Sequence, residues 1–146
     1  MEAIDKISTV TVAVTDQDEA LAWYTEKLGF EKRMDVTAGA MRWLTVAPSQ
    51  QAEIEILLAS WYPDRVGMNA TWVISTRDCK GAYEELSAKG VEFSQKPTPR
   101  PYGLEAVFKD LYGNKYALLA QTGDVYTEEV ERSYIVPGPE DLPEVA

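Results

Sequence analysis

The chain has 146 residues, of which 45% are hydrophobic and 26% are charged, a balance typical of a soluble protein with a sizeable core. The net charge of −10 argues against nucleic acid as a partner, because phosphates are bound by clustered lysines and arginines. No apolar run approaches the ~20 residues needed to cross a bilayer, and the first residues lack a signal-peptide pattern. We therefore expect a cytoplasmic protein without a membrane partner. The lone Cys79 excludes an internal disulfide.

The first half of the chain predicts the order strand, helix and three strands. Residues 7–14 predict a strand, because valines at positions 10, 12 and 14 alternate with Thr or Ala at 9, 11 and 13, which is the two-residue period of a strand. Thr15 and Asp16 are candidate N-caps of a helix that Gly29 ends as a residue in the left-handed conformation. Further strands are expected at residues 30–36, 41–46 and 53–59.

The second half predicts the same order after a connection at residues 60–69, which contains Pro63 and Gly67. A strand is expected at residues 71–75, then a helix that Asp78 caps and Gly90 ends, then a short extended segment at 91–93. Residues 95–103 carry three prolines and predict a loop or an edge segment. Strands at 105–109 and 115–120 complete the set. Cys79 falls at the start of the second helix, where the helix dipole could lower its pKa.

Sequence similarity between the halves indicates an internal duplication. Residues 55–58 (Glu-Ile-Leu-Leu) align with residues 117–120 (Ala-Leu-Leu-Ala), and residues 28–31 (Leu-Gly-Phe-Glu) align with residues 89–92 (Lys-Gly-Val-Glu). The offsets differ by one position, which one insertion explains.

These motifs resemble the vicinal oxygen chelate superfamily, which contains glyoxalase I, extradiol dioxygenases, fosfomycin-modifying enzymes and bleomycin-resistance proteins. The resemblance covers about residues 5–121, and it is carried by residues 7–14, 16–24, 28–30, 82–86, 89–91 and 110–114. It implies an α+β fold of two tandem βαβββ modules, whose curled mixed sheets enclose a cleft. Module 1 would span about residues 5–59, the linker 60–69 and module 2 about 70–121, so that residues 1–121 form one paired domain. The resemblance also implies a homodimer.

The metalloenzymes of that superfamily place metal ligands at positions that correspond here to Thr9, Glu55, Thr71 and Ala117. They would have His or Gln at the first, Glu at the second and fourth, and often His at the third. The chain contains no histidine. Thr is a poor ligand for a divalent transition metal, and Ala has no ligand atom in its side chain. We therefore expect no metal and no other cofactor.

We expect a small-molecule pocket at the former ligand positions, because small and hydroxyl-bearing residues there leave room between apolar walls. Exposed loop aromatics are candidates for stacking on a ligand. The candidate ligand-binding residues are Thr9, Thr11, Trp43, Glu55, Trp61, Tyr62, Thr71, Tyr102 and Ala117.

Glu55 is the residue with two open interpretations. A carboxylate beside apolar neighbours must be paired or hydrogen-bonded. Its partner is either internal (Arg42, Lys115 or a Thr hydroxyl) or a ligand that offers a hydrogen-bond donor or a cation. Glu55 is also the one candidate catalytic residue.

The leading hypothesis is a metal-free binding protein for a small molecule, such as an antibiotic or drug of cationic or aromatic character, similar to the bleomycin-resistance branch. The alternative is a glyoxalase-like lyase or isomerase, or a dioxygenase, with an atypical site, and a further alternative is a structural scaffold. Residues 122–146 predict an acidic C-terminal extension. Its acidity serves solubility or attracts a cationic ligand, and residues 126–134 carry a tyrosine stripe that could dock as a helix.

Overall fold

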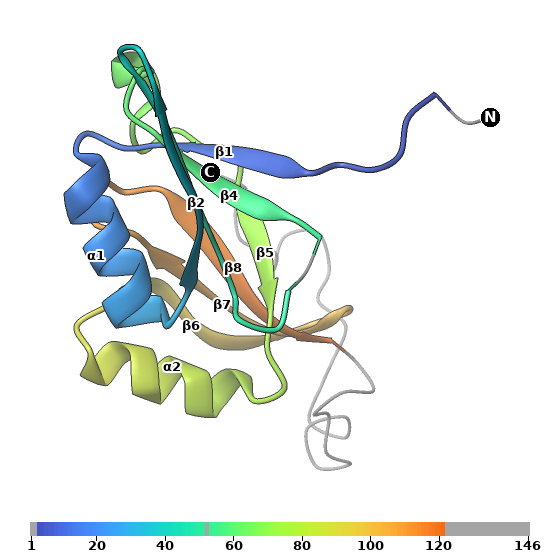
Figure 1. The fold of residues 1–146 in the computed structure, drawn as a ribbon. Helices are drawn as coiled ribbons and strands as arrows, with labels where there is room; N and C mark the ends of the chain where they lie inside the picture. The colour runs from blue at the N-terminus through green and yellow to red at the C-terminus, as the bar shows by residue number, and fades with distance from the viewer. Residues whose placement is uncertain (1–2, 52, 122–146) are drawn as a thin grey trace. The chain divides into compact units, whose positions relative to one another are not determined.

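The computed structural model describes residues 3–51 and 53–121 of the chain, and it contains the order strand, helix and three strands twice (Figure 1). The first set is β1 (Thr9–Ala13), α1 (Gln17–Leu28), β2 (Glu31–Ala38), β3 (Met41–Ala47) and β4 (Glu55–Ala59), followed by the 3-10 helix η1 (Pro63–Arg65). The second set is β5 (Trp72–Ser75), α2 (Cys79–Ala88), β6 (Glu92–Arg100), β7 (Gly103–Lys109) and β8 (Lys115–Gln121). The predicted α+β fold of two tandem modules is confirmed.

Each set of strands forms its own four-stranded sheet. The first sheet has the order β1-β4-β3-β2, and the second has the order β5-β8-β7-β6. β1 is parallel to β4, β5 is parallel to β8, and β3 is antiparallel to both β2 and β4. The described residues divide into two compact units, one before residue 71 together with Lys109–Lys115, and the other consisting of Thr71–Phe108 together with β8.

The first helix begins and ends where the sequence predicts. Asp16 accepts a 3.0 Å hydrogen bond at Oδ1 from the backbone N–H of Glu19, which satisfies one of the free donors at the helix N-terminus. Gly29 has a φ of 70°, a conformation that costs glycine little and other residues more. α1 packs against β2, β3 and β4 of the first sheet, and it buries Ala20 and Tyr24 completely.

The second helix begins in the same way as the first. Asp78 caps it by accepting a 2.9 Å hydrogen bond from the N–H of Gly81, and it ends at Ala88, one residue before the cap Lys89. A chain of ring contacts then leads from α2 across the second sheet, through Tyr83, Phe93, Phe108 and Tyr116. Phe108 and Tyr116 are fully buried, so these rings form the core of the second unit.

β6 decides between the two predictions for the proline-rich segment. It runs without interruption from Glu92 to Arg100 and includes Pro97 and Pro99. The extended segment predicted at residues 91–93 is the beginning of this longer strand, and the loop alternative for residues 95–100 is wrong. The edge alternative is right, because β6 is the outer strand of the second sheet, where a missing N–H leaves no ladder hydrogen bond unmade.

The turn at residues 110–114 belongs to the first unit and is held there by buried polar groups. Asp110 accepts hydrogen bonds from the backbone N–H groups of Tyr112 and Asn114, at 2.8 and 2.9 Å. Asn114 Nδ2 donates to the carbonyl oxygen of Ala13 at 2.9 Å, and its Oδ1 accepts from the N–H of Gly67 at 3.0 Å. A Cβ on Gly67 would lie 2.8 Å from the carbonyl oxygen of Tyr112, so this contact requires glycine.

None of the helices within residues 3–51 and 53–121 is long and apolar enough to cross a membrane. The predicted acidic extension and its tyrosine stripe at residues 126–134 lie outside the described residues.

Candidate functional site

The strand register brings Thr9, Thr11, Trp43 and Glu55 to one face of the first sheet. Thr9 lies opposite Glu55, and Thr11 lies opposite Leu57. Leu57 in turn lies opposite Thr45 of β3. Residues two apart on a strand share a face, so Trp43 lies on the same side as Thr45. We call this side the Glu55 face, and it consists of Thr9, Thr11, Ala13, Met34, Val36, Ala38, Met41, Trp43, Thr45, Ala47, Glu55, Leu57 and Ala59.

The outer part of the Glu55 face is apolar and open to solvent. Met34 is 43% exposed, Val36 53%, Met41 45% and Trp43 36%. Val36 lies directly opposite Trp43 in the antiparallel pairing of β2 with β3, so the four side chains form one patch. Single exposed apolar residues are ordinary on a protein surface, whereas contiguous apolar patches are characteristic of interaction surfaces.

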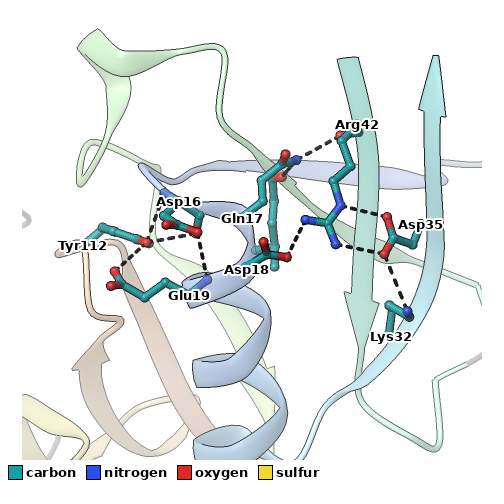
Figure 2. A network of polar contacts seen from close by, with 9 residues as sticks. Asp16, Gln17, Asp18, Glu19, Lys32, Asp35, Arg42 and Tyr112 are labelled. Carbon is teal, nitrogen blue, oxygen red and sulfur yellow. Dashed lines mark hydrogen bonds and ion pairs between the residues drawn. The ribbon is translucent and has the colours of Figure 1, made fainter. Parts of the chain in front are cut away.

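The opposite side of the same strands carries the charges and faces α1. Figure 2 shows the Arg42 guanidinium between two carboxylates: it donates to Asp35 at 2.8 and 2.9 Å and to Asp18 of α1 at 2.7 Å. Gln17 of α1 donates to the carbonyl oxygens of Arg42 and Leu58, at 2.9 and 2.8 Å. The hydrogen bonds from Arg42 lower the pKa of Asp35 to about 2. α1 therefore lies against the charged side, while Met34, Val36, Met41 and Trp43 on the other side are open to solvent and the inner residues Thr45, Leu57 and Ala59 of the Glu55 face are buried.

The sequence predictions did not include Met34, Val36 and Met41, which the structure brings to the same face as Glu55. Their signal was present, because Met34 and Val36 flank Asp35, and Met41 and Trp43 flank Arg42, which is the alternation of a two-faced strand. That alternation is usually taken to direct the apolar side chains into the core. Here the Arg42 contacts with α1 reverse the assignment.

Glu55 has an internal partner, the hydroxyl of Thr45, which donates a short hydrogen bond to Glu55 Oε1. The same hydroxyl oxygen accepts a 3.0 Å hydrogen bond from the backbone N–H of Met34. The register of β2 shifts between Lys32 and Met34, and a bulge of this kind removes a backbone group from the regular ladder. The Met34 N–H therefore fixes the orientation of the Thr45 hydroxyl toward Glu55.

Of the internal partners considered for Glu55, the Thr hydroxyl is the one observed. Neither Arg42 nor Lys115 contacts the Glu55 carboxylate in the part of the chain that the structure describes. Glu55 Oε2 accepts no hydrogen bond from the described residues. Glu55 itself is only half-buried. One carboxylate oxygen is thus held in place and the second remains available.

Trp61 and Tyr62 lie in the segment between β4 and η1. Their rings are in contact, with centroids 5.9 Å apart, and the Arg65 guanidinium lies 5.8 Å from the Tyr62 ring centroid, within cation–π range. Tyr62 is 40% exposed. These two rings and Arg65 form a local cluster of the first unit.

The remaining predicted site residues, Thr71, Tyr102 and Ala117, belong to the second unit. Thr71 is exposed and directly precedes β5. Ala117 is buried on β8, where it lies opposite Val73. Tyr102 lies between β6 and β7, and its hydroxyl donates a 2.8 Å hydrogen bond to Glu105 Oε2.

Cys79 does not have the lowered pKa that its helical position suggested. It is buried, its thiol donates to the carbonyl oxygen of Leu118 at 3.6 Å, and burial raises its pKa to about 11. The loss of hydration opposes the thiolate more than the dipole of α2 favours it. The prediction of a lowered pKa is wrong.

The residues present do not fit a catalytic metal. Thr9 and Glu55 occupy two of the positions that hold metal ligands in the superfamily's metalloenzymes, and they lie opposite each other on β1 and β4. Together they offer one hydroxyl and one carboxylate, and the carboxylate already accepts a hydrogen bond from Thr45. Within residues 3–51 and 53–121, no three His, Cys, Asp or Glu side chains lie close enough together to hold an ion. Divalent transition metals need three or four such ligands.

Two tandem βαβββ modules define a class of protein, and the chain belongs to it: residues 6–118 match the Glyoxalase/Bleomycin resistance protein/Dioxygenase superfamily.

Several relatives are similar along most of their length. The chain is 40% identical over 120 residues to the uncharacterized protein YurT of Bacillus subtilis (strain 168), a match that covers 75% of this chain and 94% of YurT. The crystal structure of UcmS2 has 39% sequence identity and a TM-score of 0.71, and covers 80% of this chain and 98% of UcmS2. The crystal structure of TnmS3, an antibiotic-binding protein from Streptomyces sp. CB03234, has 30% identity and a TM-score of 0.76, and covers 84% and 100%.

Proposed function

We propose that this protein binds a small organic molecule of antibiotic type on the Glu55 face and holds it without changing it chemically. The observation that carries the proposal is the open patch of Met34, Val36, Met41 and Trp43, placed on the same face as Glu55. Flat and flexible apolar side chains suit a ligand with an apolar body, because Trp stacks on planar groups and Met adapts to irregular ones. The antibiotic-binding relative TnmS3 supports the same class of ligand.

Binding without a metal is part of the proposal. The donor set at Thr9 and Glu55 supports it, because one hydroxyl and one carboxylate cannot replace the ligands of the superfamily's metalloenzymes. The chain also contains no histidine, which removes the base of Ser-His and Cys-His nucleophile pairs. In this proposal, the protein acts in the cytoplasm by sequestering its ligand.

Calorimetric titration with a neutral flat molecule tests the proposal. An anthraquinone that carries a methoxypropyl chain is a suitable probe, since it offers an aromatic body and no hydrogen-bond donor. We expect Met41→Ser and Trp43→Ala to weaken its binding about tenfold, because each loses the burial of one large apolar side chain. Met68→Ser is the matched control, because Met68 is 75% exposed and lies outside the Glu55 face.

Mass spectrometry of the released probe completes the test. Recovery of the intact molecule is the expected result. A chemically altered product would favour the enzyme alternative, and equal binding by wild type and by the Met41 and Trp43 variants would remove the Glu55 face from the site.

We also propose that the protein is a homodimer. β1 and β2 are the outer strands of the first sheet, and strand edges with free backbone groups are common surfaces for association. Light scattering at micromolar concentration should give twice the mass of the chain, and a monomer would contradict this proposal.

A further inference from the structure

The Glu55 face has a polar end and an apolar end. Glu55 precedes Leu57 by two residues on β4, and Trp43 precedes Thr45 by two residues on β3, while Leu57 and Thr45 lie opposite each other in an antiparallel pair. The two offsets therefore add, so that Glu55 and Trp43 are separated by about four residues, or ~13 Å, along the strands. Thr45 and Met34 lie between these ends.

The polar end offers one fixed acceptor. Thr45 holds Glu55 Oε1 through a hydroxyl that the Met34 N–H itself orients. No lysine or arginine among the described residues forms an ion pair with Glu55. Arg42 lies on the opposite side of β3 between Asp18 and Asp35 (Figure 2). A carboxylate accepts hydrogen bonds and donates none when ionised. Any group that pairs with Glu55 Oε2 must therefore supply a proton donor, and a cationic donor gives the stronger bond.

The apolar end is suited to a planar body. Trp43 lies opposite Val36, and Met34 and Met41 lie on the same face next to this pair. No charged side chain interrupts this patch among the residues that the structure describes, because Asp35 and Arg42 point to α1. A ligand that places a flat apolar body here must extend about 13 Å to reach Glu55.

From this geometry we infer that the ligand is an elongated amphiphile, with a flat apolar body at Trp43 and a protonated amine or comparable donor at Glu55, and that Glu55 is the residue that selects the donor. The inference rests on the proposed function and adds the chemical class of the ligand. The net charge of −10 agrees with it, because an acidic protein attracts a cation before contact.

A matched pair of probes separates this inference from the proposed function. One is the anthraquinone with a methoxypropyl chain, and the other has the same skeleton and ends in an aminopropyl chain. Wild type should bind the amine at least about tenfold tighter, since a hydrogen bond to a charged group has roughly that effect. Glu55→Gln should remove this preference, so that the two probes bind the variant with similar affinity.

The controls use the same readout. Glu26→Gln removes the same charge from α1, where Glu26 is exposed, and it should keep the preference for the amine. Glu55→Asp keeps the charge but shortens the side chain, and it should retain part of the preference. Circular dichroism of each variant confirms that it is folded.

The outcomes are distinct. If both probes bind wild type equally, or if Glu55→Gln keeps the preference, the inference is wrong while the proposed function stands. If neither probe binds, and Trp43→Ala converts a dimer into a monomer in light scattering, a second copy of the chain covers the Glu55 face. The ligand-binding function and the inference about the ligand's class then both fail.

Discussion

The hydroxyl of Tyr24 donates a 2.6 Å hydrogen bond to Asp110 Oδ2, although 86 residues separate the two in sequence. Tyr24 is fully buried and Asp110 is 5% exposed. Asn114 Nδ2 donates to the same carboxylate oxygen at 2.9 Å. The predicted turn residues Asp110 and Asn114 thus do more than shape a turn, because they connect it to α1 and β1 of the first unit.

Tyr24→Phe should lower the free energy of unfolding by about 1.5–3 kcal/mol, because it removes a buried hydrogen bond to a charged group. Urea denaturation measures the change. Tyr62→Phe is the matched control, since the Tyr62 hydroxyl makes no hydrogen bond to the described residues and its ring is 40% exposed. If the two variants are equally stable, the contact with Asp110 contributes nothing to folding.

The ion pair of Asp35 with Arg42 should make stability depend on pH in the acid range. The hydrogen bonds from Arg42 lower the pKa of Asp35 from 3.8 to about 2, so the folded state favours the ionised carboxyl. This contribution to the free energy of unfolding is fully present above pH 3.8 and is lost as the pH falls toward 2.

The measurement compares urea denaturation at about pH 5 and about pH 2.5. Asp35→Asn should be less stable than wild type at the higher pH, and the difference should shrink at the lower one. Asp64→Asn should have the same free energy of unfolding as wild type at both pH values, because Asp64 makes no ion pair within the described part of the chain. A gap between wild type and Asp35→Asn that does not change with pH would refute this linkage.

Cys79 should be unreactive in the folded protein. Its pKa of about 11 leaves little thiolate near neutral pH, and the thiolate is the reactive form. Ellman's reagent at pH 8 should therefore label it at least about a hundredfold more slowly than in urea-unfolded protein. Comparable rates in the two states would mean that the second unit opens readily at α2.

Protein purified without a tag should contain no stoichiometric Zn, Ni, Mn or Fe by elemental analysis. The reason is the donor set at Thr9 and Glu55, which lacks the three or four ligands that these ions require. Stoichiometric metal that disappears in Glu55→Ala would contradict this expectation and would revive the enzyme alternative.

Most of the fold could be predicted from local chemistry. Asp16 and Asp78 cap the two helices because a short acidic side chain satisfies free N–H groups wherever it precedes a helix. Gly29 ends α1 because the required backbone conformation suits glycine. These effects depend on neighbours within a few residues, and the duplication then supplies the order of strands.

The site was harder to predict because it depends on contacts between distant segments. The alternation in β2 and β3 divides Asp35 and Arg42 from Met34 and Trp43, but it does not say which side is covered. That depends on Asp18 and Gln17 of α1, which bind Arg42 and hold the charged side against α1. The partner of Glu55 likewise depends on a register shift in β2 that no local pattern in the sequence indicates.

The turn at residues 110–114 also has a consequence for biosynthesis. Asn114 and Asp110 are the hydrogen-bond partners of groups that the ribosome adds much earlier. These groups are the carbonyl oxygen of Ala13, the N–H of Gly67 and the hydroxyl of Tyr24. A nascent chain that ends at Ala70 already contains every helix and strand of the first repeat. It still lacks Asp110 and Asn114, whose side chains complete the hydrogen bonds of these elements. The first unit is therefore finished only after translation has passed through most of the second, and a gene for the first repeat alone would encode an incomplete fold.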